Sequence, residues 1–140
     1  MENKALSFDT GLVTYSLNGK VDLVFNPTDS VFVERLFDAF TSLDKKQEEY
    51  RSEIEKAEKR EIFDIARKRD AEMREMIDGA LGAPVCDAVF GDMNVYALAN
   101  GLPVWANLLL AVLDEADTSF AEEQRKTNAR IRKYSDKYKK

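Results

Sequence analysis

The chain has 140 residues, a formal net charge of −5, no histidine and one cysteine. A chain of this length suits a single domain with one modest core. The absence of histidine and of any Cys/His spacing excludes a structural zinc site and a disulfide framework, so we expect Cys86 to be a small buried apolar residue. The first residues lack the basic start and apolar run of a signal peptide, and the longest apolar stretch, 108–113, is too short to span a bilayer. We therefore expect a cytoplasmic protein without membrane contact.

Charge is distributed unevenly along the chain. Residues 125–140 carry one aspartate, so their net charge is +7 and residues 1–124 carry −12. The eight basic residues of this tail are Arg125, Lys126, Arg130, Arg132, Lys133, Lys137, Lys139 and Lys140. Three interpretations of this basic tail remain open. It is a solvated helix end favoured by the helix dipole, a segment that docks on an acidic protein surface such as a neighbouring copy, or a nucleic-acid binder that releases counterions. We favour the first two interpretations over nucleic acid.

The first predicted element is a β-hairpin. Two strands, 12–17 and 20–25, flank Asn18-Gly19, the dipeptide best suited to the positive φ angles of a type I′ turn. Pairing across a two-residue turn puts apolar residues on both faces of the hairpin, so neither face is cleanly polar. One face carries Leu12, Val21, Leu23 and Phe25, and the other carries Val13, Tyr15, Leu17 and Val24. A lone hairpin is marginal in water. We therefore expect it to pack on helices and to gain a further strand, from residues 6–8 or from a second copy.

Residues 28–78 contain neither glycine nor proline, and about half of them are charged. One helix over this span would be on the order of 75 Å long, so it either bends back or projects and needs a partner. Its first part has an apolar face that we assign to the core: Phe32, Val33, Leu36, Phe37 and Phe40. A 4-3-4-3 pattern, typical of a coiled coil or a long helical hairpin, then runs through Leu36, Phe40, Leu43, Gln47, Tyr50, Ile54 and Ala57. Gln47 is its one polar position.

The pattern is offset by one residue after Ala57. It resumes at Ile62 instead of Glu61 and continues through Ala66, Arg69, Met73 and Met76. Residues 58–61 offer none of the glycine, proline or asparagine chemistry of a turn. We therefore predict a continuous helix whose contact face rotates at this point, and residues 42–44 are the better place for a kink.

Glycine and proline reappear from Gly79 onward, so we expect shorter elements there. We predict a short helix over 84–90 that Pro84 opens and Gly91 closes, a second short helix over 94–99 that ends at Asn100-Gly101, and a final helix after Pro103. The final helix has a broad apolar face that supplies the second half of the core: Val104, Trp105, Leu108, Leu109, Val112, Leu113, Ala116 and Phe120.

Together these elements predict a mainly α protein with an N-terminal β-hairpin (α+β), in which a long helical arm accompanies a small helical core. We expect one domain, with a hairpin region at 1–28, a long or kinked helical arm at 29–78, short helices and a core helix at 84–124, and the basic tail at 125–140.

Catalytic chemistry has little support in the sequence. Two acidic clusters occur, Asp87 with Asp92 and a second one at 114–117, but no glycine-rich loop, nucleophile elbow or carboxylate-metal loop accompanies them. We interpret these carboxylates as helix caps and solvated turns. The sequence therefore predicts a protein that is not an enzyme and that uses no cofactor or metal.

Three parts of the chain carry a family resemblance. The first part combines residues 6–15, Phe25-Asn-Pro-Thr-Asp29 and residues 32–37. The second part is Cys86-Asp-Ala-Val-Phe-Gly-Asp92. The third part is Asn128-Ala-Arg-Ile-Arg-Lys-Tyr-Ser135. The first resembles small proteins encoded in tail-gene clusters of long-tailed (siphovirus-type) phages and prophages of Firmicutes-type bacteria. The other two are similar to the Asp-x-x-Phe-Gly-acidic turn and the basic Ile-x-Lys-Tyr-Ser/Thr close of the tail assembly chaperones in those clusters.

The resemblance implies a non-enzymatic chaperone, in the host cytoplasm, that coats the tape-measure protein and promotes tail-tube assembly around it. Many such proteins also exist in a longer, frameshifted form. On this hypothesis the chain binds tape-measure and tail-tube proteins, forms a homo-oligomer, and contacts its partner through the arm at Tyr50, Ile54, Ile62, Met73 and Met76.

Other classes of function remain open. The chain is alternatively an oligomeric coiled-coil scaffold or adaptor, or a phage-encoded inhibitor that binds a host protein. A nucleic-acid binder that uses Arg125, Lys126, Arg130, Arg132 and Lys133 of the basic tail is a further rival.

Overall fold

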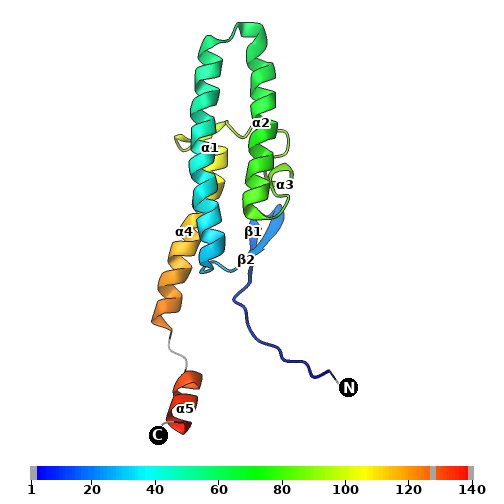
Figure 1. Cartoon of the computed structure of the whole chain (residues 1–140). Helices are drawn as coiled ribbons and strands as arrows, with labels where there is room; N and C mark the ends of the chain where they lie inside the picture. The colour runs from blue at the N-terminus through cyan, green and yellow to red at the C-terminus, as the bar shows by residue number, and fades with distance from the viewer. Residues whose placement is uncertain (1–2, 127–128, 139–140) are drawn as a thin grey trace.

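A computed structural model describes residues 3–126 and 129–138. It confirms a mainly α chain with an N-terminal antiparallel β-hairpin. Figure 1 shows two long helices, α1 and α2, side by side, with the hairpin, α3 and α4 packed around their lower half. The N-terminal segment and α5 extend away from this body at the same end (Figure 1). Asn128, Lys139 and Lys140, which the sequence analysis assigned to the resemblance and to the basic tail, lie outside the described residues.

Strands β1 (Val13–Leu17) and β2 (Val21–Phe25) form the predicted hairpin, but its register differs by one residue from the prediction. Asn18 and Gly19 have the expected positive φ angles of 52° and 69°. However, Leu17 pairs with Val21 and Tyr15 with Leu23, so that Lys20 becomes an extra loop residue. A one-residue slip moves side chains to the opposite face of a strand. The apolar residues at odd positions of both strands therefore share one face, and the opposite face is polar except for the exposed Val24.

The buried face of the hairpin is held by stacked aromatic rings. Tyr15 stacks on Phe25 with ring centroids 4.7 Å apart, and Phe25 stacks on Phe32 of α1 at 4.6 Å. The predicted third strand is absent from the described residues, where the sheet has two strands and residues 6–8 are extended and exposed. The helices alone cover the hairpin, on its odd-numbered face.

The span without glycine and proline is two helices, α1 (Ser30–Lys56) and α2 (Lys59–Leu81), and the predicted continuous helix is wrong. Asp29 caps α1 by accepting a 3.0 Å hydrogen bond from the amide of Val31. At Ala57 and Glu58 the backbone becomes extended, with ψ angles of 150° and 154°, and the chain reverses. Extended φ/ψ values are open to every residue, so this reversal needs no special turn residue. The one-residue offset in the apolar pattern marks the passage from one helix to the other.

The segment after α2 contains one short helix, not two. Helix α3 (Cys86–Phe90) ends at Gly91 as predicted, whereas the predicted helix over 94–99 is wrong. Instead, Leu98–Ala99 (β3) pairs with Leu102–Pro103 (β4) around Asn100 and Gly101, whose φ angles of 55° and 78° again suit a tight hairpin. Helix α4 (Val104–Arg125) follows directly after Pro103, as predicted, and α5 (Ala129–Lys137) is the last element.

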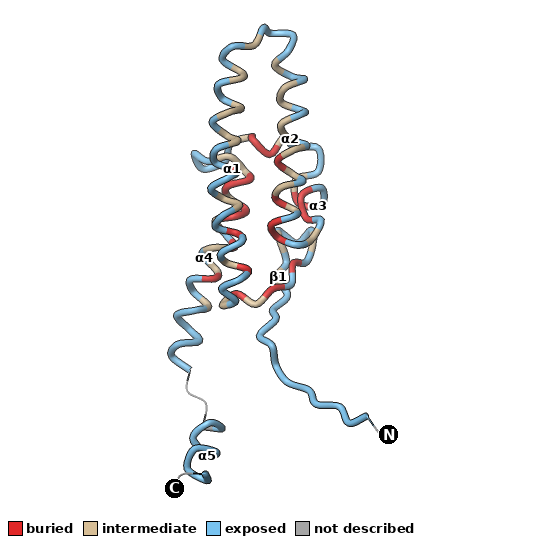
Figure 2. Tube along the Cα trace, viewed as in Figure 1, coloured by how far each residue is buried: buried red, intermediate tan, exposed pale blue. Residues whose placement is uncertain are grey.

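The core lies where α1, α2, α4 and the hairpin meet, and Figure 2 places the buried residues in the lower half of the α1–α2 pair. Its most enclosed side chains come from all parts of the chain: Leu23, Leu36, Leu43, Met73, Ile77, Val85, Cys86, Val95, Trp105 and Leu109. Cys86 is buried, as predicted. Two predicted core residues are not, because Phe37 is 61% exposed and Phe120 is 52% exposed.

Candidate protein-binding surfaces

The outer half of the α1–α2 hairpin, residues 44–72, contains no buried residue. We call this segment the arm. Its boundaries are Leu43 on α1 and Met73 on α2, which are 0% and 1% exposed. Figure 2 shows the tip of the arm rising beyond the other elements with only half-buried and exposed residues. Other elements reach the apolar seam at the base of the arm, where Tyr50 stacks on Tyr96 and Gln47 accepts a hydrogen bond from Trp105, whereas Ile54 and Ile62 nearer the tip remain half-buried.

Ion pairs tie the two helices of the arm together beside that seam. The guanidinium of Arg69 reaches Glu53 at 2.7 Å and Glu49 at 3.3 Å on α1, and Lys46 reaches Glu72 at 3.1 Å. The hydrogen bond to Glu53 raises the pKa of Arg69 above its ordinary value. Exposed ion pairs each contribute about 0–1 kcal/mol. These ion pairs therefore orient the two helices of the arm while each adds little to its stability.

The structure divides the five predicted partner contacts. Ile54 and Ile62 are half-buried in the arm seam, on either side of the turn at 57–58. Tyr50 lies at the base of the arm and stacks on Tyr96 with centroids 4.2 Å apart. Met73 belongs to the core, so its prediction as a partner contact is wrong. Met76 is also packed against the core cluster, although it is partly exposed.

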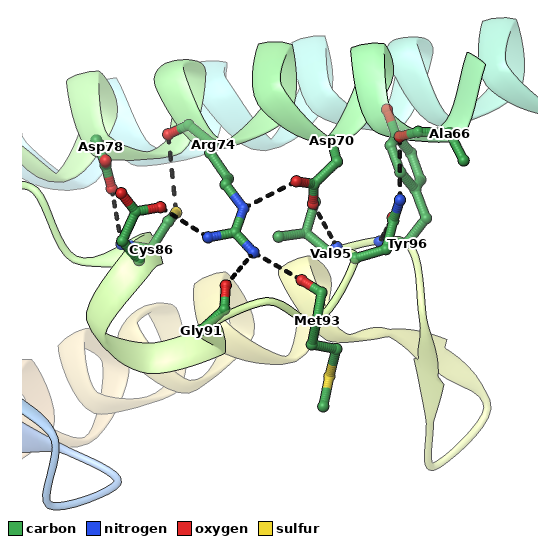
Figure 3. A network of polar contacts seen from close by, with 11 residues as sticks. Ala66, Asp70, Arg74, Asp78, Cys86, Gly91, Met93, Val95 and Tyr96 are labelled. Atoms are coloured by element: carbon green, nitrogen blue, oxygen red, sulfur yellow. Dashed lines mark hydrogen bonds and ion pairs between the residues drawn. The ribbon is translucent and has the colours of Figure 1, made fainter. Parts of the chain in front are cut away.

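Below the arm, a stripe of charged residues on α2 fastens the loop that carries α3 (Figure 3). Arg74 is its centre. The guanidinium donates 2.7 Å hydrogen bonds to the carbonyl oxygens of Gly91 and Met93 and to the carboxylate of Asp87. It also donates a 3.0 Å bond to Asp70. Burial opposes the charged form of Arg74, but the bonds to Asp87 and Asp70 outweigh burial and raise its pKa.

Two carboxylates of the same stripe bind backbone amides of the loop. Asp70 accepts a 2.8 Å hydrogen bond from the amide of Val95, and Asp78 accepts bonds of 3.0 Å from the amides of Val85 and Cys86. Residues 70, 74 and 78 are spaced at i, i+4 and i+8, which places them on one face of α2. Sequence reasoning missed this stripe because charged residues on a helix are usually solvated, and the regular spacing was the available signal.

The Cys86–Asp92 motif, which carries part of the family resemblance, lies on α3 and the turn held by Arg74. Asp87, predicted to be a helix cap or solvated, has a side chain that is 94% exposed, and it also pairs with Arg74 at 2.7 Å. The thiol of Cys86 is enclosed, and burial raises its pKa above the ordinary value. This motif therefore builds the body of the protein and presents no reactive group at the surface.

A polar groove of about 680 Å³ lies between the N-terminal segment and the outer end of α4. We call it the acidic groove, since its charged lining consists of four acidic residues and one basic residue: Asp9, Glu115, Glu122, Glu123 and Lys126. At its floor, the hydroxyl of Tyr15 donates a 3.1 Å hydrogen bond to Glu115. Lys126 lies 2.9 Å from the carboxylate of Glu123, and this hydrogen bond raises the pKa of Lys126. The ammonium group of Lys126 therefore neutralises part of the negative charge of the groove.

The predicted basic tail begins beside this groove. Arg125 is the last residue of α4, and Lys126 lines the groove. Arg130, Arg132 and Lys133 are exposed on α5. The structure therefore places one of the five predicted tail residues in the groove (Lys126), one at the end of α4 (Arg125) and three on α5.

Neither a metal cluster nor a membrane-spanning helix is found in the part of the chain that the structure describes: no three Cys, Asp or Glu residues are placed to hold an ion, and no helix is both long and apolar enough to cross a bilayer. Comparisons of the chain with protein-family profiles, with curated proteins and with solved structures give no match.

Proposed function

We propose that the chain is a non-enzymatic chaperone of phage tail assembly, whose arm binds a helical stretch of the tape-measure protein and so promotes tail-tube assembly in the cytoplasm of the infected bacterium. One observation carries the proposal. Residues 44–72 form a helical hairpin that has an apolar seam and no buried residue.

A two-helix layer can bury its seam from one side only. An amphipathic helix laid along the two helices covers the other side, which is the helix-in-groove mode of peptide recognition. The half-buried Ile54 and Ile62 lie in this seam, and Phe63 beside them is 70% exposed. Covering an aliphatic side chain completely contributes roughly 1.5–3 kcal/mol. The arm therefore offers a helical partner a short apolar track near its tip.

A tape-measure protein is a suitable partner for such a track because it is a long helical chain that tends to aggregate. Many copies of a weak binder along one chain hold it by avidity, without any single tight site. The resemblance of the segments at 6–15, 86–92 and 128–135 to tail assembly chaperones supports the same assignment.

The test is co-expression with the tape-measure protein of the same gene cluster. We expect the wild-type chain to raise the soluble yield of the tape-measure protein and to copurify with it. The variant Ile54→Ser/Ile62→Ser should lose both effects, because it makes the seam polar. The matched control Glu55→Ser/Lys59→Ser changes exposed positions of the same arm and should keep both.

Folding of each variant is checked separately by the fluorescence of Trp105, the chain's one tryptophan, which lies in the core and outside the arm. If the wild-type chain neither binds nor solubilises the tape-measure protein, the chaperone proposal fails. If the seam variant loses only self-association, the arm is the joint of an oligomeric scaffold, which is the alternative function.

A further inference from the structure

Helix α5 is amphipathic, and its large apolar side chains lie at the surface. Residues 130–138 are all exposed, and the large apolar side chains among them remain 76% (Ile131), 50% (Tyr134) and 71% (Tyr138) exposed. These three residues are spaced at i, i+3 and i+7, so they form one stripe along the helix. A stripe of this kind is typical of a helix that packs on another surface.

A basic stripe runs next to the apolar one. Arg130, Lys133 and Lys137 have the same i, i+3 and i+7 spacing, displaced by one residue from Ile131, Tyr134 and Tyr138. The ammonium groups of Lys133 and Lys137 lie 5.8 Å and 5.6 Å from the ring centroids of Tyr134 and Tyr138. A surface that fits α5 must therefore be acidic and must also offer apolar contact.

The acidic groove has both properties. Its carboxylates come from Asp9 on the N-terminal segment and from Glu115, Glu122 and Glu123 on α4. Its apolar lining includes Leu12 and Val13, which are 62% and 40% exposed. In Figure 1, α5 continues away from the end of α4, and the residues that line the groove include none of the described residues of α5. The body carries −12 over residues 1–124, and the tail from residue 125 onward carries +7.

We propose that α5 of one copy docks in the acidic groove of a second copy, with its basic stripe on the carboxylates and its apolar stripe on Leu12 and Val13. The tail and the groove are different surfaces. Two copies that exchange their tails reciprocally form a closed pair, and one-way contacts repeated from copy to copy form a ring or a filament. This assembly is independent of the arm and of the proposed chaperone function, because it uses neither the seam nor a tape-measure protein.

The test measures self-association of the full chain by sedimentation velocity over a concentration series, at salt concentrations of about 0.05 M and about 0.5 M. The screening length falls from roughly 14 Å at the lower salt concentration to roughly 4 Å at the higher one, so we expect association to weaken in the higher salt. The tail variant Lys133→Glu/Lys137→Glu and the groove variant Glu122→Lys/Glu123→Lys should each weaken association by about tenfold or more.

Matched controls reverse the same number of charges on the exposed face of the arm. Lys59→Glu/Lys68→Glu and Glu55→Lys/Glu58→Lys should associate like the wild-type chain. The neutral variant Lys133→Gln/Lys137→Gln keeps residues of similar helix propensity. It should weaken association by less than the reversed tail, which separates loss of charge complementarity from loss of the helix.

Restoration by charge exchange decides the proposal. The reversed tail and the reversed groove fit each other, so mixing the two variants should restore association, and so should combining both changes in one chain. A chain that sediments as one species at every concentration overturns the proposal. So does association that persists with the reversed tail, or that mixing fails to restore. Tail-dependent binding to RNA or to anionic vesicles, without self-association, assigns α5 to a nucleic acid or a membrane instead.

Discussion

The side-chain oxygen of Gln47 on α1 accepts a 2.9 Å hydrogen bond from the indole nitrogen of Trp105 on α4. Trp105 is 1% exposed, and its ring packs 5.5 Å from the ring of Phe40. The one polar residue in the 4-3-4-3 pattern thus satisfies the indole N–H that α4 inserts into the core. This bond fixes how far α4 lies along α1.

We predict that Gln47→Leu destabilises the protein, although it makes the pattern on α1 uniformly apolar. The substitution leaves the buried N–H of Trp105 without an acceptor, which costs about 1–3 kcal/mol. Urea unfolding followed by circular dichroism measures the free energy of unfolding. The effect of Gln47→Leu should shrink to within about 0.5 kcal/mol in a Trp105→Phe background, where no N–H remains to be satisfied. An unchanged effect in that background would show that the hydrogen bond is not its cause.

The hairpin register predicts opposite outcomes at two adjacent positions of β2. Leu23 is 1% exposed and Val24 is 53% exposed. Leu23→Ala should lower the free energy of unfolding by about 2–5 kcal/mol, as expected for a cavity in a core. Val24→Ala should change it by no more than about 0.5 kcal/mol, as at an ordinary surface site. A large loss at Val24 with little loss at Leu23 would indicate the other register.

Arg74→Lys should loosen the loop after α3 despite keeping the charge. A lysine ammonium cannot reproduce the planar fork that reaches Asp70, Asp87 and two carbonyl oxygens. Hydrogen bonds to charged groups each contribute about 1.5–3 kcal/mol, so we expect a loss of roughly 2–3 kcal/mol in the free energy of unfolding. Hydrogen exchange should accelerate at the amide of Val95. Arg67→Lys, on the exposed side of the same helix, is the matched control and should change neither measurement.

Alkaline pH should destabilise the protein through Cys86. Burial raises the pKa of its thiol in the folded state above the ordinary value of 9.0. As the pH rises past 9.0, the unfolded chain loses this proton first, so the free energy of unfolding falls until the folded-state pKa is reached. Burial also raises the pKa of Tyr96, but from an ordinary value of 10.0, so its effect begins at higher pH.

Between pH 9 and 10, the wild-type free energy of unfolding should therefore fall by about 1 kcal/mol more than that of Cys86→Ala. Urea unfolding of both proteins at pH 7, 9 and 10 makes the comparison, and the constant cost of the missing sulfur cancels in the differences. Parallel pH profiles for the two proteins would contradict the assignment.

Local patterns were enough to predict most of the elements. The Asn18-Gly19 turn, the closure of α3 by Gly91 and the start of α4 after Pro103 all follow from residue chemistry within a few positions. The register of the hairpin and the reversal at 57–58 do not. Register depends on one extra loop residue, and the reversal uses extended backbone that every residue adopts, so neither leaves a mark in composition.

The candidate surfaces were predicted less well than the elements. Ile54 and Ile62 do lie in the arm, but Met73 has the same spacing and is buried, because the helical period indicates a face and not what covers it. Asp70 and Arg74 were missed for a related reason. Charged residues at helical spacing look alike whether they meet water or the backbone of a distant loop.

Because the buried core ends at Leu43 and Met73, the length of the outer part of the arm can change without a change in the fold of the body. Inserting seven residues in α1 between 54 and 56, with seven matching residues in α2 between 59 and 62, preserves the seam and extends the hairpin by about 10 Å. No side chain of the core is touched by such a change. Evolution or design can thus adjust how much of a helical partner one copy spans while leaving the fold intact.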